Sequence, residues 1–469
     1  AKTATVAAVG ITNTDGTITG KSLSANSHTQ AFNNTRGKLI ASGTSQADTL
    51  NIQSGVFTNT QGGNIISSAA ATISANSLNN QGGQVQAVGN ADITLSDRLN
   101  NAGSLIRSGQ NLTINAASVT NTNTNTNTNT NTNTNTNANA NANAQNNHQG
   151  LEGQHIALTA RHIDNTAGAI RANRDTTLAS SGTIHNSHGR ISAGHTLTLQ
   201  DLAPAALAIP PTHGTRNTGH TLVAQNPAAN KTLAVTNTHG TLLAGQQLTV
   251  DSARLSGDGN VLSQGNLHLQ IDQPLTNTGP IAANGHARVE TAATLTNQTT
   301  LAAGNHLNIK AAAIDNQAGG TISATNVILQ AIDSHTLTNR GTINGTQTVL
   351  ETPTLNNLGT GKIYGDHIAV SATTVTNAAE HTAGQTHAPV IAARHQLDIG
   401  ANKINNREHA LLFSGGDLII GGGLDASKQA TGQATALHNA SATIEAMRHT
   451  NINVTTLHNT NEHFTTTTH

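Results

Sequence analysis

The sequence has no cysteine and no tryptophan, and aromatic residues make up only 1% of its 469 positions. Without cysteine the chain can form no disulfide, no thiolate metal site and no cysteine nucleophile. Without bulky aromatic side chains it lacks the residues that usually dominate a globular core. A narrow core made of repeated rows of aliphatic side chains would not need them.

Charge is also scarce. Charged residues are 10% of the chain, against about a quarter in typical domains, and the formal net charge is −1. A chain without a basic excess has no electrostatic footprint for nucleic acid, so we predict no nucleic-acid partner. The sequence has no run of about 18 apolar residues, so we predict no membrane-spanning helix.

The main feature of the sequence is a short repeat. The pattern aliphatic-x-Asn, with one degenerate copy at residues 255–257, recurs roughly every 20 residues, a period that indicates a stacked repeat architecture. Each copy continues with a small-residue stretch and then an alternating segment such as Leu267-His268-Leu269. Period-two alternation indicates strands, and glycine and asparagine between them indicate turns.

We therefore predict an all-β fold, a right-handed parallel β-helix of roughly 20 coils of about 20 residues each. One predicted core row contains Leu255, Leu275, Leu295, Ile314 and Leu337. The predicted turn asparagines include Asn186, Asn237, Asn277, Asn297, Asn316 and Asn339. Asparagine at a turn tolerates the left-handed backbone region, and identical amides on stacked coils can bond each other in a ladder.

Four segments interrupt the repeat. We predict β-helix coils over residues 1–119 and 151–469, separated by an Asn-Thr and Asn-Ala low-complexity insertion at 120–150. Two interpretations of this insertion stay open: a protruding loop with little order, or slack strands that continue the stack, because threonine favours strands. Further excursions from the coils are predicted near 201–216, 378–389 and 421–436, and the first contains prolines that cannot donate to a ladder.

No motif predicts catalysis. Residues 16–22 (GTITGKS) resemble a phosphate-binding loop, but three residues separate the glycines where four are required. The 24 histidines lack the spacing of a zinc protease helix, and we interpret them as polar residues on a solvated face. Acidic residues are scattered and Tyr364 is the only tyrosine, whereas glycosidases need a pair of carboxylates. We predict no catalytic residues, no cofactor and no metal.

The repeat resembles the haemagglutinin repeats of filamentous haemagglutinin-like exoproteins. The residues that carry the resemblance are 184–193 (IHNSHGRISA) and 99–105 (LNNAGSL), repeated with variation along essentially the whole chain. Residues 412–418 (LFSGGDL), followed by Leu424-Asp425, are similar to a segment near the end of the first repeat region in that family. Residues 457–464 (LHNTNEHF) are similar to its closing sequence.

This resemblance implies a two-partner secretion exoprotein, secreted or displayed on a bacterial cell surface at the outer membrane. It also implies an outer-membrane two-partner secretion transporter as partner. Relatives include adhesins and contact-dependent growth-inhibition proteins. We expect a structural stalk that projects a distal adhesive or toxin-bearing region. The alternative is a direct adhesin that binds a host-cell or bacterial-cell receptor or glycan through loops near Pro210 and His387. A polysaccharide-active β-helix enzyme ranks third.

Overall fold

The computed structural model describes residues 2–124, 149–202, 231–332 and 335–466. Throughout these residues the secondary structure is β, without a helix, and parallel coils stack into a β-solenoid of about 19 turns, about 21 residues apart. The predicted all-β, parallel β-helix class is thus confirmed. The chain divides into two compact units, unit 1 (Ala1–Leu255) and unit 2 (Ser256–His469).

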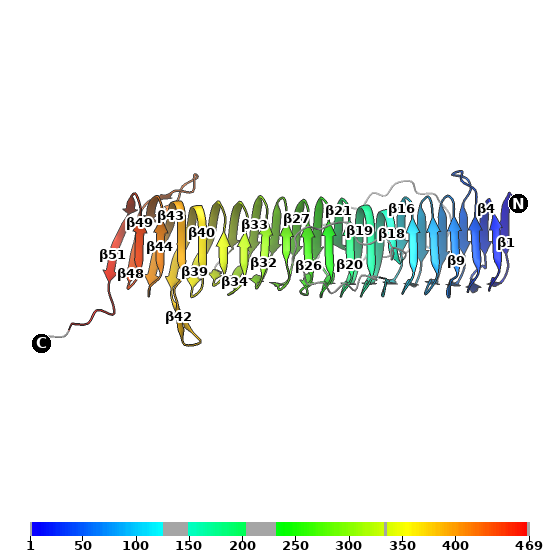
Figure 1. Ribbon diagram of the computed structural model, residues 1–469, viewed down its shortest axis with the longest axis horizontal. Helices are drawn as coiled ribbons and strands as arrows, with labels where there is room; N and C mark the ends of the chain where they lie inside the picture. The colour runs from blue at the N-terminus through cyan, green and yellow to red at the C-terminus, as the bar shows by residue number, and fades with distance from the viewer. Residues whose placement is uncertain (1, 125–148, 203–230, 333–334, 467–469) are drawn as a thin grey trace. The chain divides into compact units, whose positions relative to one another are not determined.

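Most coils consist of three short strands, and each strand pairs in parallel with its counterpart in the next coil, so that three sheets run along each unit. Figure 1 shows the stacked coils. In unit 1 the first sheet contains β3 (Thr17–Gly20), β6 (Lys38–Ala41), β9 (Asn64–Ser67), β12 (Gln84–Ala87), β15 (Leu105–Ser108), β20 (Arg190–Ala193) and β23 (Thr241–Ala244). The second contains β1 (Thr3–Ala7), β4 (Ser22–Asn26), β7 (Leu50–Gln53), β10 (Ala71–Ala75), β13 (Ala91–Leu95), β16 (Asn111–Asn115), β21 (Thr196–Asp201) and β24 (Gln247–Ser252). The third contains β2 (Ile11–Thr12), β5 (Phe32–Asn33), β8 (Val56–Thr58), β11 (Ser77–Asn79), β14 (Arg98–Asn100), β17 (Ser118–Thr120) and β22 (Ala234–Thr236). The long strands β18 (Gly150–Asp164) and β19 (Ala169–His185) pass through all three sheets, and β25 is Arg254–Ser256.

Unit 2 repeats this arrangement. Its first sheet contains β26 (Asn260–Ser263), β29 (Ile281–Ala283), β32 (Thr300–Ala303), β35 (Thr321–Ser323), β38 (Thr342–Asn344), β44 (Leu411–Ser414) and β49 (Thr443–Ala446). Its second contains β27 (Asn266–Ile271), β30 (Ala287–Thr291), β33 (His306–Ala311), β36 (Asn326–Ala331), β45 (Asp417–Gly421) and β50 (Thr450–Ile452). Its third contains β28 (Leu275–Asn277), β31 (Thr294–Asn297), β34 (Ala313–Asn316), β37 (Thr336–Asn339), β48 (Ala434–Ala440) and β51 (Val454–Thr460). The strands β39 (Gln347–Leu358), β40 (Lys362–Ala378) and β43 (Val390–Arg407) run round the corners between sheets.

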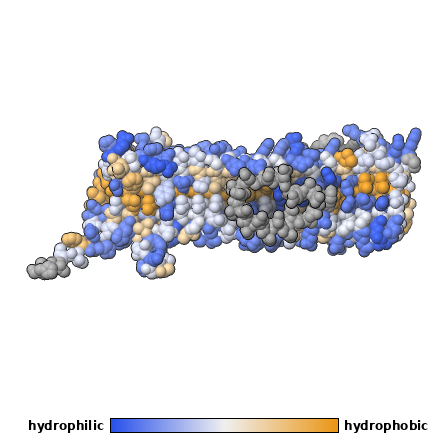
Figure 2. All heavy atoms as spheres, viewed as in Figure 1, coloured by the Kyte–Doolittle hydropathy of each residue, from blue (hydrophilic) through white to orange (hydrophobic). Residues whose placement is uncertain are grey.

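The alternation of apolar and polar residues along each strand explains which side chains form the core. On the third sheet of unit 1, Phe32 and Phe57 are fully buried, pair in register, and place their ring centroids 5.0 Å apart. Their neighbours along the strand, Asn33 and Thr58, are only half-buried. Figure 2 shows hydrophilic residues along the margins of the face it draws, with paler and hydrophobic patches between them. Because every inward side chain meets its equivalent in the next coil, small aliphatic residues fill the interior of a coil without a large aromatic core.

The turn after the third strand has a glycine in most coils because the preceding coil lies too close for a side chain. A Cβ on Gly240 would lie 2.0 Å from the backbone oxygen of Asn186, and a Cβ on Gly189 would lie 2.2 Å from that of Asn165. Any side chain at this position would therefore collide with the preceding coil. The left-handed residue of the turn lies just before the glycine, as at His188 (φ 55°).

The structure locates two of the predicted excursions. Segment 378–389 contains β41 (Glu380–Thr382) and β42 (Gln385–His387), which form an antiparallel hairpin that leaves the coils (Figure 1). Segment 421–436 contains β46 (Gly423–Leu424) and β47 (Ala430–Thr431), also antiparallel. The Asn-Thr and Asn-Ala tract lies almost entirely outside the described residues, as does most of the predicted excursion at 201–216.

The described residues contain no helix of a length and hydrophobicity that would cross a membrane.

Candidate functional site

The predicted turn asparagines lie in the interior rather than on the outer surface of the turns. Within each unit the Nδ2 of one asparagine donates a hydrogen bond to the Oδ1 of its counterpart in the next coil, at 2.7–2.9 Å. In unit 1 this ladder joins Asn13, Asn34, Asn59, Asn80, Asn101, Asn121, Asn165, Asn186 and Asn237. In unit 2 it joins Asn277, Asn297, Asn316, Asn339, Asn357, Asn377, Asn406, Asn439 and Asn459.

The ladder satisfies amides that have no access to water. Asn186, Asn297, Asn316 and Asn339 are fully buried, while Asn237 and Asn277 are nearly so. The second Nδ2 proton bonds a backbone oxygen, as in the contact from Asn316 to Thr342. The proposed ladder is confirmed. The left-handed conformation proposed for these asparagines is wrong, because positive φ falls later in the turn, at residues such as His188 and His239.

The predicted core row lies beside this ladder. Leu275 pairs with Leu295, Leu295 with Ile314, and Ile314 with Leu337, all in parallel register. Their exposed fractions are 2% or less, and that of Leu255 is 6%. These residues act as structural spacers, and they present no group to a ligand.

The segment that resembled a phosphate loop is part of the stack. Residues 17–20 form β3, residues 22–26 form β4, and both pair with the following coil. Histidines from neighbouring coils stack in pairs, such as His286 and His306 with ring centroids 4.9 Å apart. Among the residues that the structure describes, no group of three or more histidine, aspartate or glutamate side chains is arranged to hold a metal ion.

The best candidate for a binding site lies under the β41–β42 hairpin of unit 2. The hairpin turns at Ala383 (φ 52°) and Gly384 (φ 78°). Arg340 fastens its base by donating two hydrogen bonds to the Glu380 carboxylate, at 2.8 and 2.7 Å. This hydrogen bond, opposed by burial and supported by the charges of Glu380 and Asp315, raises the pKa of Arg340 above its ordinary value. Gly359 makes room for the pair, because a Cβ there would lie 2.7 Å from Glu380 Oε2.

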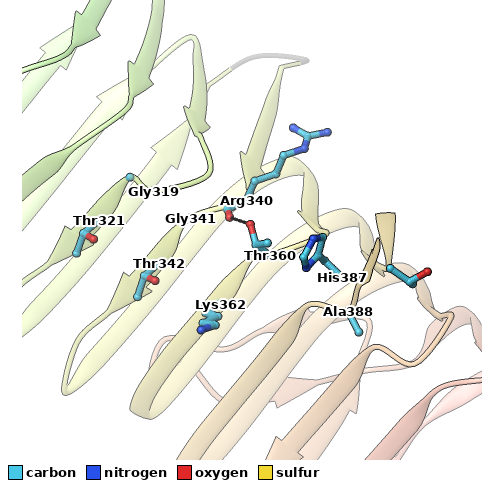
Figure 3. Close-up of a pocket in the computed structure, with 11 residues that line it drawn as sticks. Gly319, Thr321, Arg340, Gly341, Thr342, Thr360, Lys362, His387 and Ala388 are labelled. Atoms are coloured by element: carbon cyan, nitrogen blue, oxygen red, sulfur yellow. Dashed lines mark hydrogen bonds between the residues drawn. The ribbon is translucent and has the colours of Figure 1, made fainter. Parts of the chain in front are cut away.

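A cavity of about 440 Å³ opens beside the hairpin, and we call it the groove. Its floor consists of Thr321, Thr342 and Lys362, which occupy the same position on three successive strands of the first sheet (Figure 3). Thr360 and Gly341 belong to the adjoining turns, and His387 and Ala388 come from the hairpin side. The lining contains no carboxylate.

Thr360 and Arg340 are connected as well as adjacent. The Thr360 hydroxyl donates to the backbone oxygen of Arg340, as the dashed line in Figure 3 marks. This bond connects two turns that form one wall of the groove. The Thr360 side chain that makes it is exposed. The groove is thus held by the solenoid on one side and by the Arg340–Glu380 pair on the other.

The β46–β47 hairpin is fastened to unit 2 by a buried carboxylate. Asp398 is fully buried, and it accepts hydrogen bonds from Gln396 Nε2 and from the backbone nitrogen of Ala430, each at 2.7 Å. His367 Nε2 lies 2.9 Å from the same carboxylate. Lys428 reaches back to Glu351 at 2.7 Å. These contacts hold a surface loop in place.

Sequence reasoning indicated the hairpin and His387 but missed Arg340, Thr360 and Lys362. One signal was present: Arg340 and Thr360 both follow a ladder asparagine within three residues, which places them on adjacent turns. Comparison with protein families, curated proteins and solved structures finds no match.

Proposed function

We propose that the chain is the structural stalk of a bacterial two-partner secretion exoprotein, secreted or displayed at the cell surface. In this function it projects a distal adhesive or toxin-bearing region, and an outer-membrane two-partner secretion transporter exports it. The observation that carries the proposal is the continuity of backbone pairing and amide ladder from coil to coil within each unit. The haemagglutinin-type repeat of the sequence supports the exported setting.

The stalk proposal predicts that the number of coils sets how far the distal region stands from the cell surface. Deleting residues 278–439 joins two equivalent ladder positions and removes about seven coils, or about 34 Å at about 4.8 Å per coil. The test is a fusion of the chain between a two-partner secretion domain and a C-terminal epitope tag on bacterial cells. The distance of the tag from the outer membrane should fall by about that length in the deletion. An unchanged distance, or a tag that never reaches the surface, would contradict the proposal.

We also propose a second candidate, direct adhesion to a receptor or glycan of a host or bacterial cell. The groove and the hairpin that walls it favour this function, because together they form a recess beside an outward sheet face. The test is attachment of the purified chain to cells, compared with a variant in which residues 380–387 are replaced by a short glycine-serine linker. Equal attachment of both proteins, or none by either, would count against adhesion through this hairpin.

A further inference from the structure

Three floor residues of the groove present free donors in a straight row. Between strands, Thr321 pairs with Thr342 and Thr342 with Lys362, so their side chains recur at about 4.8 Å on one face. The residues that follow them, Ile322, Ile343 and Ile363, point inward and are fully buried. Neither threonine hydroxyl nor the Lys362 ammonium bonds another side chain in the described part of the chain.

The charge of this row is positive and uncompensated. Lys362 is exposed, and no carboxylate lines the groove. The nearest acid on the hairpin, Glu380, is already engaged by both Arg340 nitrogens. Arg340 therefore serves to hold the wall, and Lys362 is the cation that faces the cavity (Figure 3). One free cation suits a ligand with one carboxylate at this point rather than a multiply charged phosphate cluster.

One aromatic residue, Tyr364, lies on the same strand as Lys362, next to the lining of the groove. Tyr364 follows Lys362 by two residues on β40, so the two side chains leave the same face of the strand. Tyr364 is half-buried, and it pairs with exposed Asn344 on the neighbouring strand. An aromatic ring offers an apolar face with a polar hydroxyl at its edge, and the asparagine adds an amide donor and acceptor.

We propose that the groove binds an acidic oligosaccharide of the uronic-acid type. Its carboxylate lies against Lys362 Nζ, its ring hydroxyls bond Thr321 and Thr342, and a neighbouring sugar packs on Tyr364. The cavity of about 440 Å³ falls within the range of ligand clefts, roughly 300–1,000 Å³. A ligand with polar groups at regular intervals matches a row of donors at regular intervals, which favours a saccharide chain over a compact anion. This inference rests on the second proposed function, adhesion.

The test is calorimetric titration of the full 469-residue chain at pH 7.5 with trigalacturonate, maltotriose and sodium sulfate at matched ionic strength. We expect trigalacturonate to bind at least about tenfold more tightly than maltotriose, because one charge-assisted contact contributes about that factor. Excess sulfate should not displace it. No measurable binding of trigalacturonate, or equal binding of maltotriose, overturns the proposal, and full displacement by sulfate reduces the groove to a simple anion site and also overturns it.

Two variants locate the site. Lys362→Ala should weaken trigalacturonate binding about tenfold. Lys403→Ala, at an exposed strand lysine outside the groove, should leave the affinity unchanged. Equal weakening by both variants would mean that net charge, not the groove, binds the ligand, and would refute the assignment. Tyr364→Ala is a second probe, and it should weaken binding while Tyr364→Phe retains most of it.

The ligand assignment and the adhesion proposal fail in different ways. If the chain attaches to cells but trigalacturonate does not bind, adhesion stands and the ligand class is wrong. If trigalacturonate binds and Lys362→Ala weakens it, but the chain attaches to no cell, the site stands and adhesion fails.

Discussion

The inner asparagines of the ladder, such as Asn297, Asn316 and Asn339, bury amides that would otherwise be bonded by water. The bonds from Asn297 to Asn316 and from Asn316 to Asn339, at 2.8 and 2.7 Å, replace those water contacts and link three coils. A buried polar group without a partner costs about 1–3 kcal/mol. Loss of one asparagine therefore also destabilises the neighbouring coils, because their buried amides lose a hydrogen-bond partner. The ladder thus penalises coils that stack out of register.

Leu295 in the aliphatic row gives a prediction at the residue scale. Leu295 is fully buried between Leu275 and Ile314, so Leu295→Asp places an unpaired carboxylate in a dry interior. We expect the free energy of unfolding to fall by several kcal/mol. Thr276→Asp, at an exposed position of the adjacent strand, is the control and should change it by less than about 0.5 kcal/mol. Chemical denaturation compares the two, and an unchanged midpoint for Leu295→Asp would show that the row is not a core row.

The rows could be predicted because they depend only on the period. A residue such as Leu295 is identified by its distance from Leu275, and parallel coils in register turn that distance into contact. The conformation of the asparagines could not be predicted in the same way. Both a left-handed turn residue and an inward amide fit the same sequence, and the structure decides between them by placing positive φ at residues such as His188 and the amide bond at Asn186.

At the scale of elements, the two described hairpins differ in how they are fastened. The Arg340–Glu380 pair that holds β41–β42 is about one-third exposed, so its contribution to stability is small. We expect Glu380→Ala to leave the unfolding midpoint unchanged within error while proteolysis at residues 382–386 becomes faster. Glu290→Ala, which removes a surface pair elsewhere in unit 2, should not accelerate cleavage there. Slower cleavage in Glu380→Ala, or a large loss of global stability, would contradict this description.

The β46–β47 hairpin should respond to acid. Burial tends to raise the pKa of Glu351, but hydrogen bonds from Lys428 and Gln330 and the charge of Lys428 outweigh it, so this pKa lies below its ordinary value. A carboxylate with a lowered folded-state pKa stabilises the fold above its unfolded pKa, about 4.3, and loses that contribution as the pH falls through the folded value. Hydrogen-exchange protection of residues 423–431 should therefore persist from about pH 7 to about pH 5 and decline below about 4.3.

The control for this prediction is Glu351→Gln, which removes the titrating group. Protection of the hairpin in this variant should be low at neutral pH and should vary less with pH. If the variant and the original protein show the same profile, Glu351 does not fasten the hairpin.

The groove lay beyond sequence reasoning for a physical reason. Arg340 and Glu380 are separated by 40 positions, and their contact depends on where a non-repeating hairpin folds back on the coils. A period fixes only residues that repeat, and Glu380 belongs to a segment without a counterpart in other coils. The place of Lys362 in the groove could not be predicted for a related reason. A lysine at an outward strand position is common, and only the neighbouring hairpin makes this one part of a groove.

At the scale of the whole molecule, the unusual property is many histidines on a chain with little fixed charge. The net charge is −1 at pH 7 with 24 histidines neutral, and protonation near pH 5 brings it to about +20. We expect the chain to be retained on heparin resin more strongly at pH 5.5 than at 7.5 at matched salt. Lys362→Ala should shift both elution positions slightly and leave their difference intact, because this effect belongs to the whole surface. Equal retention at the two pH values would contradict it.

Stability passes from coil to coil through the buried amide ladder, as in other stacked repeats. The direct test is hydrogen exchange followed by mass spectrometry on Asn316→Ala, with Asn284→Ala at an exposed turn as control. We expect Asn316→Ala to lose about 1–3 kcal/mol of protection in the coils of Asn297, Asn316 and Asn339. Protection at residues 2–124 should not change, and the control should match the original protein. Loss spread evenly over the described residues, or no loss in the three coils, would contradict the claim.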